Sequence, residues 1–457
     1  MPVFSKQRAV TKTVWIVGVV VTAALIGSGR SSAQLGMVVS ASGATPFHVA
    51  AHEGDVVTVL RLLADGADAE SKTRHGVTAL ALASAGGHSA VVEALLVAGS
   101  DPNVSSPEGE SPLMVAARTG VVDSVTFLLR HGADVNAREG WLGQTALMWA
   151  AAENHAEIVT PIVAADADID ARSDAGFTPL VFAARAGHIR TVKALLDAGA
   201  DINLSLLDGT SPLVIAVINA HYELASFLLE RGADPNADKQ GWTALHQLVW
   251  TRRPNTSRNN PSALPTGNTT DLQLVEVLVA YGADINARQV KEPQDGYRNM
   301  LNRVGATPFL LAAKAVDLEL MRLFLKFGAD PMLANEDGTT ALLVAAGVGV
   351  WPNESPGTDK EALEAVQLML ELGDSVATID DNGDAALHGA VMRGSKELVL
   401  YLLDQGAALN PINERGWTPL TIAQGVFYGN LGRRFPDVEV LLIGRGATSP
   451  VSPKPPK

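Results

Sequence analysis

A pattern of hydrophobic and polar positions returns along most of the chain at intervals of about 33 residues. One copy begins at Thr178-Pro179-Leu180 and continues through the small pair Ala183-Ala184 to a turn at Gly187-His188. The apolar pair Leu195-Leu196 follows, and the copy closes at Gly199. Apolar residues with this spacing predict two short helices in each copy, one on either side of the Gly-His turn.

The residues at the helix ends fit the same interpretation. The Thr178 side chain can accept a backbone N–H at the start of the first helix, and Pro179 suits the first helical position because its missing N–H is not needed there. Gly199 can adopt the left-handed conformation that ends the second helix. Neither helix buries enough apolar surface alone. We therefore expect neighbouring copies to stack into one elongated core.

Eleven copies can be counted, and the first contains the run TPFHVA at Thr45–Ala50. The copies begin at Thr45, Thr78, Ser111, Thr145, Thr178, Ser211, Thr243, Thr307, Thr340, Ala385 and Thr418. This run and the period resemble ankyrin repeats over about residues 44–447. The resemblance implies an all-α ankyrin-repeat solenoid of helix-turn-helix units joined by β-turn or hairpin fingers. The run TALMWAA at Thr145–Ala151 is similar to bacterial members of the family.

Three copies are longer than the others, and their extra residues all fall between the first and second helices. The extra segments lie near residues 251–270, 348–360 and 426–436, and they are rich in Pro, Gly and Asn. Because they interrupt the same place in the unit, stacking should bring them to one edge. A fourth insertion, residues 289–305, lengthens the finger between the seventh and eighth copies. The fourth copy differs in another way, since Pro161 should kink or shorten its second helix and Asp166 replaces the closing glycine.

The insertions can be interpreted in two ways. Long surface loops cost little in closure entropy, so they can be tolerated decoration. Loops on a rigid scaffold also often carry function, and Arg and aromatic residues anchor many interfaces. The residues of these types in the insertions are Arg252, Arg253, Arg258, Trp351, Phe427, Tyr428, Arg433 and Arg434. Their content favours a binding role, with an acidic patch on the partner.

The resemblance also implies that a protein partner binds the concave face formed by the fingers and first helices. The finger residues at the corresponding positions are Lys72, Arg74, Glu108, Arg138, Glu139, Trp141, Arg172, Asp174, Phe177, Leu206, Leu207, Lys239, Trp242, Glu336, Asp381, Glu414 and Arg415. Leu206 and Leu207 are unusual, because apolar residues in a turn suggest a contact with the insertions or with a partner. We expect Trp149 to lie in the core and Trp417 to be partly exposed near a finger.

Residues that suggest catalysis or metal binding have simpler explanations. His48 and His52 lie four apart, but the segment lacks the Glu of an H-E-x-x-H motif, and His48 is the histidine of the repeat pattern. The recurring Asp residues, such as Asp134 and Asp201, are one turn position copied from unit to unit. The sequence contains no nucleophile-elbow, phosphate-loop or dinucleotide motif. We expect no catalytic residue, no cofactor and no metal.

The first 33 residues have the features of a signal peptide. Lys6, Arg8 and Lys12 precede the uncharged run Val14–Ile26, and Ser31-Ser32-Ala33 fits a cleavage site before Gln34. This uncharged run has 13 residues, fewer than the roughly 20 that a membrane span requires. We expect residues 34–43 to form a linker and the Pro-rich residues 448–457 to be a disordered tail. The protein is then periplasmic or secreted; an uncleaved segment that anchors it to a membrane is the alternative.

Composition narrows the partner class. The 457 residues include no cysteine and carry a formal charge of −14, which becomes −18 when residues 1–33 and their four basic side chains are removed. Absence of cysteine excludes disulfides and thiolate sites, and the acidic charge argues against nucleic acid. We expect a monomeric interaction scaffold without catalytic activity. The alternatives are an inhibitor or immunity-type subunit of an exported enzyme and an enzyme or small-ligand protein that uses the insertions.

Overall fold

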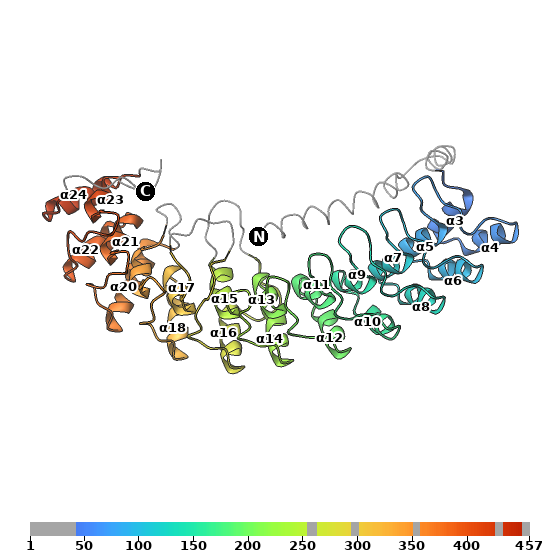
Figure 1. Ribbon diagram of the computed structural model, residues 1–457, viewed down its shortest axis with the longest axis horizontal. Helices are drawn as coiled ribbons and strands as arrows, with labels where there is room; N and C mark the ends of the chain where they lie inside the picture. The colour runs from blue at the N-terminus through green and yellow to red at the C-terminus, as the bar shows by residue number, and fades with distance from the viewer. Residues whose placement is uncertain (1–42, 254–262, 294–300, 351–356, 426–432, 450–457) are drawn as a thin grey trace. The chain divides into compact units, whose positions relative to one another are not determined.

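The computed structural model describes residues 43–253, 263–293, 301–350, 357–425 and 433–449. These residues form helices and turns without a β-strand, apart from isolated bridges between Lys72 and Thr78 and between Ile379 and Ala385. The chain divides into two compact units, one up to Leu207 and one from Asp208. The expected all-α repeat architecture is confirmed (Figure 1).

The helices occur in consecutive pairs, a first and a second helix in each repeat. The pairs of the N-terminal unit are α3 (Pro46–Glu53) with α4 (Val56–Ala64), α5 (Ala79–Gly86) with α6 (Ser89–Val97), α7 (Pro112–Thr119) with α8 (Val122–Arg130), α9 (Ala146–Ala152) with α10 (Ala156–Val163), and α11 (Pro179–Ala186) with α12 (Ile189–Asp197). In this unit each first helix packs against the first helix of the next repeat, and each second helix against the next second helix.

The C-terminal unit follows the same order. Its pairs are α13 (Pro212–Ile218) with α14 (Tyr222–Glu230), α15 (Ala244–Arg252) with α16 (Asp271–Ala280), α17 (Pro308–Lys314) with α18 (Leu318–Lys326), α19 (Ala341–Ala346) with α20 (Asp359–Glu371), α21 (Ala386–Arg393) with α22 (Lys396–Asp404), and α23 (Pro419–Ala423) with α24 (Pro436–Gly444). All three predicted loops are shorter than expected, because Arg252 still belongs to α15, Asp359 and Lys360 already belong to α20, and Pro436 begins α24.

The predicted helix caps are confirmed. Thr178 accepts a hydrogen bond from the backbone N–H of Val181 at 3.2 Å, and Pro179 occupies the first helical position. Asp166, which replaces the usual glycine, is left-handed with φ 64°. The helix that contains Pro161 is one residue shorter than α8 and α12, as expected for a residue that cannot donate a backbone hydrogen bond.

Histidines bond each repeat to its neighbours. In the turn between the two helices, His188 Nε2 donates to the Ala152 carbonyl of the preceding repeat at 3.1 Å, and His88 and His155 make the same type of bond. The histidine near the start of a first helix bonds in the other direction: His246 Nε2 donates to the Ala306 carbonyl at 3.1 Å. These histidines therefore satisfy backbone carbonyls between repeats.

The recurring Asp and Asn residues form a ladder along the base of the turns. Asp134 accepts a hydrogen bond from the N–H of Asn136 at 3.0 Å. The side-chain oxygen of Asn136 accepts the N–H of Asp168 in the next repeat at 2.8 Å, and its side-chain nitrogen donates to the Asp166 carbonyl. These carboxylates therefore satisfy backbone groups, which agrees with the prediction that they are a copied turn position.

The core consists of small and branched apolar residues on the facing sides of the helices. Trp149 is 8% exposed, which agrees with its predicted place in the core. Trp417 is 1% exposed, so the expectation of partial exposure is wrong. Its backbone N–H is bonded to the Asn413 side chain at 3.0 Å, and its carbonyl accepts a hydrogen bond from His388, so the residue faces the interior of the turn.

We predict that His246 makes the free energy of unfolding depend on pH. Burial lowers the pKa of His246 to about 4, so the unfolded chain binds more protons between pH 4 and 6.5. Stability should therefore be constant above pH 6.5 and fall on acidification toward pH 4. At about 1.4 kcal/mol for each pKa unit, the total loss is about 3 kcal/mol.

Urea denaturation of the wild-type chain and of His246→Gln at a series of pH values measures this contribution. The variant should lose less stability than the wild type on acidification. Parallel pH profiles for the two proteins would contradict the prediction.

Candidate interaction surfaces

The turns between repeats are called finger turns from here on, and four of them share one capping arrangement. A short polar side chain five positions before the helix N-cap residue accepts two backbone N–H groups of the turn. Asn335 accepts from Asp337 and Thr339 at 3.1 and 2.7 Å. Equivalent pairs of bonds are made by Ser106, Asp380 and Asn413. The side chain that follows this cap is then directed outward at the tip.

Backbone hydrogen bonds also join several tips to the preceding finger. The N–H of Asp174 donates to the Leu142 carbonyl at 2.8 Å, and the N–H of Asp381 donates to the Asp337 carbonyl at 2.9 Å. Glu414 makes the same bond to Asn382 at 2.9 Å. The backbone of the tips is therefore fixed by repeated bonds that do not depend on the identity of the tip side chains.

The finger of the fourth repeat contains one extra residue and uses a longer cap. The buried carboxylate of Glu139 accepts the N–H groups of Trp141 at 2.6 Å, Leu142 at 3.0 Å and Gln144 at 2.9 Å. Three backbone donors offset the cost of burying a charge without a cation partner. Glu139 is thus a structural residue, which corrects its assignment as a partner contact.

The structure exposes most of the predicted finger residues. The exposed residues are Lys72, Arg74, Arg138, Trp141, Asp174, Leu207, Lys239, Glu336, Asp381 and Glu414, and the half-buried ones are Glu108, Arg172, Trp242 and Arg415. Glu139, Phe177 and Leu206 are buried. Burial removes these three side chains from the set that a partner could contact.

Phe177 and Leu206 are buried for different reasons. The Phe177 ring packs 5.5 Å from the Phe182 ring, with the Arg185 guanidinium 5.9 Å away. Leu206 occupies the cap position of its finger, where other repeats hold an inward-facing polar side chain. Leu207 follows at the tip and is 74% exposed. A side chain on Gly176 would lie 2.6 Å from Leu207 Cγ, so the glycine makes room for the next finger.

Several half-buried finger residues are held by internal contacts. Arg172 donates to the Gly176 carbonyl at 3.1 Å and to the Ser205 carbonyl at 2.8 Å. Trp242 packs 5.6 Å from Trp250, and its indole N–H donates to Gln247 at 3.2 Å. These contacts fix the orientation of the side chains and leave part of each surface accessible.

The finger insertion at residues 289–305 folds back toward the first helix of its repeat. The N–H of Gln289 donates to the Ala306 carbonyl at 2.9 Å, which closes the base of the insertion. Arg303 lies 5.5 Å from the Trp250 ring and forms an ion pair with Glu292 at 2.9 Å. The described ends of this insertion are therefore ordered by contacts with α15.

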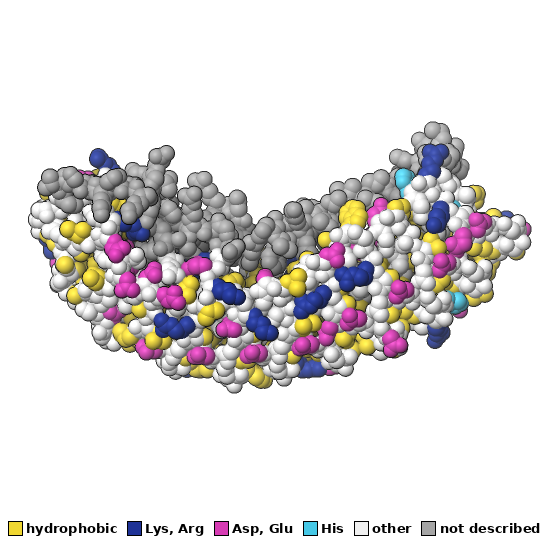
Figure 2. Space-filling model, in the orientation of Figure 1, with side chains coloured by type: hydrophobic (Ala, Val, Ile, Leu, Met, Phe, Trp, Pro, Cys, Tyr) yellow, Lys and Arg dark blue, Asp and Glu magenta, His cyan; other side chains and the backbone are white. Residues whose placement is uncertain are grey.

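Charge is unevenly distributed over the N-terminal unit. Residues 43–207 carry twenty acidic and ten basic side chains. The finger turns and first helices, residues 43–53, 71–87, 104–120, 137–154, 171–187 and 204–207, contain six of each. The second helices and their flanking turns contain the other fourteen acids and four bases. Figure 2 shows acidic side chains, with a few Lys and Arg among them, over the lower part of the visible face, where Figure 1 places the second helices. The side formed by the fingers and first helices, the finger face, is neutral.

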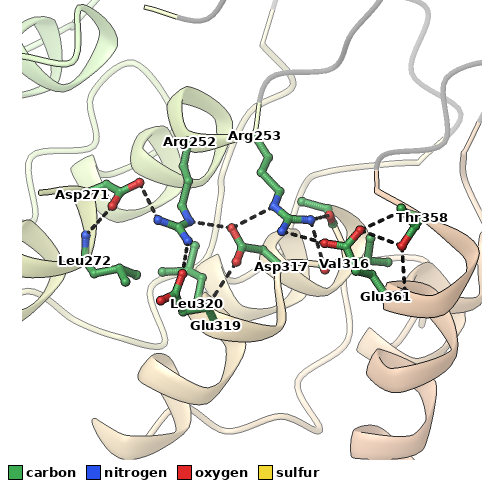
Figure 3. A network of polar contacts seen from close by, with 11 residues as sticks. Arg252, Arg253, Asp271, Leu272, Val316, Asp317, Glu319, Leu320, Thr358 and Glu361 are labelled. Carbon is green, nitrogen blue, oxygen red and sulfur yellow. Dashed lines mark hydrogen bonds and ion pairs between the residues drawn. The ribbon is translucent and has the colours of Figure 1, made fainter. Parts of the chain in front are cut away.

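In the C-terminal unit, Arg252 and Arg253 form an ion-pair cluster, called the arginine clamp, at the end of α15 (Figure 3). The Asp317 side chain is 1% exposed. Its Oδ2 atom lies 2.7 Å from Arg252 Nε and 3.3 Å from Arg253 Nε. Arg252 also reaches Asp271 at 2.5 Å and Glu319 at 2.5 Å. These contacts oppose the predicted role of Arg252 as a partner contact, because its guanidinium is satisfied inside the unit.

Arg253 extends the clamp to another repeat. Its guanidinium bonds Glu361 at 3.0 Å and the Val316 carbonyl at 3.3 Å. The pKa of the Glu361 carboxyl is lowered. The largest cause is the hydrogen bond from the Thr358 backbone, and the bonds from Arg253 lower it further. Burial would lower the pKa of the Arg252 guanidinium, but the bonds to Asp317 and Asp271 raise it. Both directions favour the charged forms of the Arg252 guanidinium and the Glu361 carboxyl at neutral pH. Arg253, too, is an internal bridge between repeats.

The clamp follows from a local change in the repeat pattern. Arg252 and Arg253 stand where other repeats have a left-handed residue and a histidine, such as Gly187 and His188. Without the turn, α15 continues, and its last side chains reach forward to the next two repeats instead of back. Asp317 stands at the histidine position of the eighth repeat and caps α18 by accepting the N–H of Leu320 at 3.2 Å.

The insertion that begins at the arginine clamp ends near residue 270, and this end is bonded to the preceding repeat instead of the following ones. Thr266 Oγ1 and His221 Nδ1 lie 2.7 Å apart, and the N–H of Asn268 donates to Glu223 at 3.0 Å. The two ends of the insertion thus contact the sixth repeat on one side and the eighth and ninth on the other. The insertion joins four consecutive repeats of the unit.

The clamp lies at one end of a groove between α16 and α18. Leu272, Gln273, Glu276, Glu319, Arg322, Leu323 and Lys326 line a volume of about 390 Å³. Lys326 and Glu276 form an exposed pair at 3.4 Å in this groove. One insertion, residues 289–305, separates the two second helices in the sequence, and the arginine clamp connects the repeats where helix packing is open.

The described insertion ends agree in part with the predicted common edge. Arg253 joins the first insertion to Glu361, which follows the insertion of the ninth repeat. Near the third insertion, Arg433 and Arg434 are exposed, and Arg434 Nε donates to the Gln424 carbonyl at 3.0 Å. Arg258, Trp351, Phe427 and Tyr428 lie outside the described residues.

The described residues contain no group of three His, Asp or Glu side chains that could hold a metal ion. Both ring nitrogens of His48 are engaged, Nδ1 with Thr45 at 2.8 Å and Nε2 with the Ser71 carbonyl at 2.9 Å. No helix in the described part of the chain is long and apolar enough to cross a membrane.

A sequence profile of the family described as "Ankyrin repeats (3 copies)" matches residues 21–106, 82–173, 113–206, 180–258 and 358–442. These matches cover more than half of the chain. The chain therefore belongs to the ankyrin repeat family, as its repeat pattern predicts.

Curated relatives match shorter stretches. Protein phosphatase 1 regulatory subunit 27 of Homo sapiens is 44% identical over 73 residues, which are 16% of this chain and 43% of that protein. The mitochondrial disaggregase of Homo sapiens is 32% identical over 192 residues, 37% of this chain and 25% of that protein. This chain spans less than half the length of these relatives. Among solved structures, the human ASB11 ankyrin repeat domain is 26% identical, with a TM-score of 0.43, over 52% of this chain and 99% of that one.

Sequence reasoning missed the acidic half of the clamp. Asp271, Asp317, Glu319 and Glu361 lie 19 to 109 residues after Arg252 in the sequence. One local signal was available. Asp317 stands at the histidine position of the eighth repeat, and Arg253 stands at the same position of the seventh. That pair of exceptions could have indicated a compensating contact.

We predict that Asp317→Ala strongly destabilises the C-terminal unit. The substitution leaves two guanidinium groups near each other with their shared buried acceptor removed, which typically costs about 3 kcal/mol or more. Glu276→Ala is the matched control, because it removes an exposed pair in the same groove and should cost less than about 1 kcal/mol. Urea denaturation measures both, and equal effects would contradict a special role of the clamp.

Proposed function

We propose that this protein is a non-catalytic interaction scaffold of eleven ankyrin repeats that binds a protein partner through the finger face. One observation carries the proposal. The tip side chains are exposed and differ from finger to finger, whereas the bonds that hold the tips recur. Such an arrangement separates the residues that specify the fold from those that can specify a partner.

The charge distribution supports the same face. The second helices and their turns hold the acidic excess of the N-terminal unit, and the finger face is neutral. A neutral face can bury its side chains against a partner without desolvating many unpaired acids. The similarity to a phosphatase regulatory subunit over 73 residues is also consistent with a protein that acts by binding another protein.

We propose in addition that the chain is exported to the periplasm or secreted. The charged residues before Val14 and the small residues before Gln34 support cleavage after Ala33. The inhibitor or immunity-type subunit remains a narrower form of the same proposal, in which a single exported enzyme is the partner. No described contact favours an enzyme or a small-ligand protein built from the insertions.

Site-specific photo-crosslinking in the producing organism tests the binding face. A photoreactive residue is placed at Arg74 or Asp381 on fingers, and at Val97 or Arg190 on second helices as matched exposed controls. The finger positions should crosslink to one recurring protein, and the controls should not. Crosslinks confined to the second helices would contradict the proposal, and loss of the captured protein's enzymatic activity on binding would identify an inhibitor.

Export is tested separately by N-terminal sequencing of the mature protein. We expect the sequence to begin at Gln34 in protein recovered from the exported fraction. An intact N-terminus recovered with the membrane fraction would instead support the uncleaved anchor.

A further inference from the structure

We propose that Trp141 is the anchor of the finger face and that it inserts into an apolar pocket on the protein partner. This inference rests on the proposed function and names the chemistry of the contact. The Trp141 side chain is 51% exposed, although it is one of the largest apolar side chains in the chain. An exposed indole on a turn gains stability when it is buried against a partner, and Trp is among the residue types that most often dominate interfaces.

The turn beneath Trp141 is built to hold its position. Its own N–H and those of Leu142 and Gln144 are bonded to the buried Glu139 carboxylate. The N–H of Gly140 donates to the Glu108 carbonyl of the preceding finger at 2.8 Å, and the Leu142 carbonyl accepts from Asp174 of the next. Bonds to both neighbours and to an internal cap fix the backbone on either side of the indole. Little conformational entropy remains to be lost on binding.

The extra residue in this finger serves to present the indole. Other fingers are capped by Ser, Asn or Asp five positions before the helix N-cap residue, whereas this finger has Glu139 six positions before Thr145. The longer Glu139 side chain spans the longer turn. The backbone N–H groups of the turn are therefore still capped despite the extra residue. Gly143, left-handed with φ 64°, leaves space that a side chain would take from the Arg138–Asp174 pair.

The surroundings of Trp141 select a protein over a nucleic acid or a lipid surface. Bases stack on exposed indoles, but phosphate binding also requires an excess of Lys and Arg. The finger face of this unit holds equal numbers of acidic and basic residues, and the nearby Arg138 is paired with Asp174 at 3.2 Å. The partner surface should therefore combine an apolar pocket with a rim of hydrogen-bonding groups and little net charge.

The test uses cyclic peptides selected from a random phage-displayed library on the full wild-type chain. Each selected peptide is titrated against the wild type, Trp141→Ala, Glu139→Ala and Val97→Ala. Val97 is the matched control, because it is 73% exposed on the second-helix side. We expect Trp141→Ala to weaken binding about 30-fold and Val97→Ala less than about twofold. Glu139→Ala should also weaken binding, because it releases the turn while it retains the indole.

Three contrary results are distinguishable. Peptides that lose binding to Arg74→Glu but keep it to Trp141→Ala would overturn the anchor and leave the finger face as the binding surface. Peptides that are insensitive to every finger variant would overturn both proposals. In parallel binding assays, the protein could bind single-stranded DNA or anionic vesicles more tightly than the peptides. That result would overturn the assignment of the partner class.

Discussion

The structure depends on the requirement that every turn between repeats satisfies its own backbone while it remains at the surface. A solenoid of short helices has many helix ends and turns, and each brings N–H and C=O groups that need partners. Here Thr and Ser caps, turn histidines, the Asp and Asn ladder and the finger caps supply them. The turn histidines and the ladder reach the adjacent repeat, so contacts that satisfy the backbone also fix the spacing of the repeats.

This constraint explains which parts the sequence could predict. Thr178, Pro179 and Gly187 act within a few residues of themselves, and their roles follow from general cap and turn preferences. His48 and Asp134 could be recognised as structural because the same residue returns at the same place in the period. The all-α repeat fold and the boundaries of most helices follow from such local and periodic signals.

The remaining features depend on contacts that a repeat pattern does not encode. Phe177 and Glu139 stand in finger turns, yet both are buried. Phe177 packs on Phe182, and the Glu139 carboxylate turns inward to accept three backbone N–H groups. Arg252 and Arg253 have the composition of an interface, but their carboxylate partners come from their own repeat and from the next two repeats. Exposure therefore cannot be assigned from position within the unit alone, because a departure in one repeat can be compensated in another.

The arginine clamp and the Glu139 turn illustrate two ways to accommodate an insertion in a regular array. In the first, an interrupted repeat loses its turn histidine and gains ion pairs to the repeats ahead. In the second, one extra residue is absorbed by one longer capping side chain, and an aromatic residue is left at the tip. The first solution uses the inserted residues to hold the array together, and the second makes them available to a partner.

Amide hydrogen exchange at the finger of the fourth repeat tests most directly the claim that the tips are fixed while their side chains are free. If the account is correct, the N–H groups of Trp141, Leu142 and Gln144 exchange slowly in the free protein, at rates close to those of α9, and Glu139→Ala abolishes this protection. Unprotected exchange of these three groups in the wild-type chain would contradict the account.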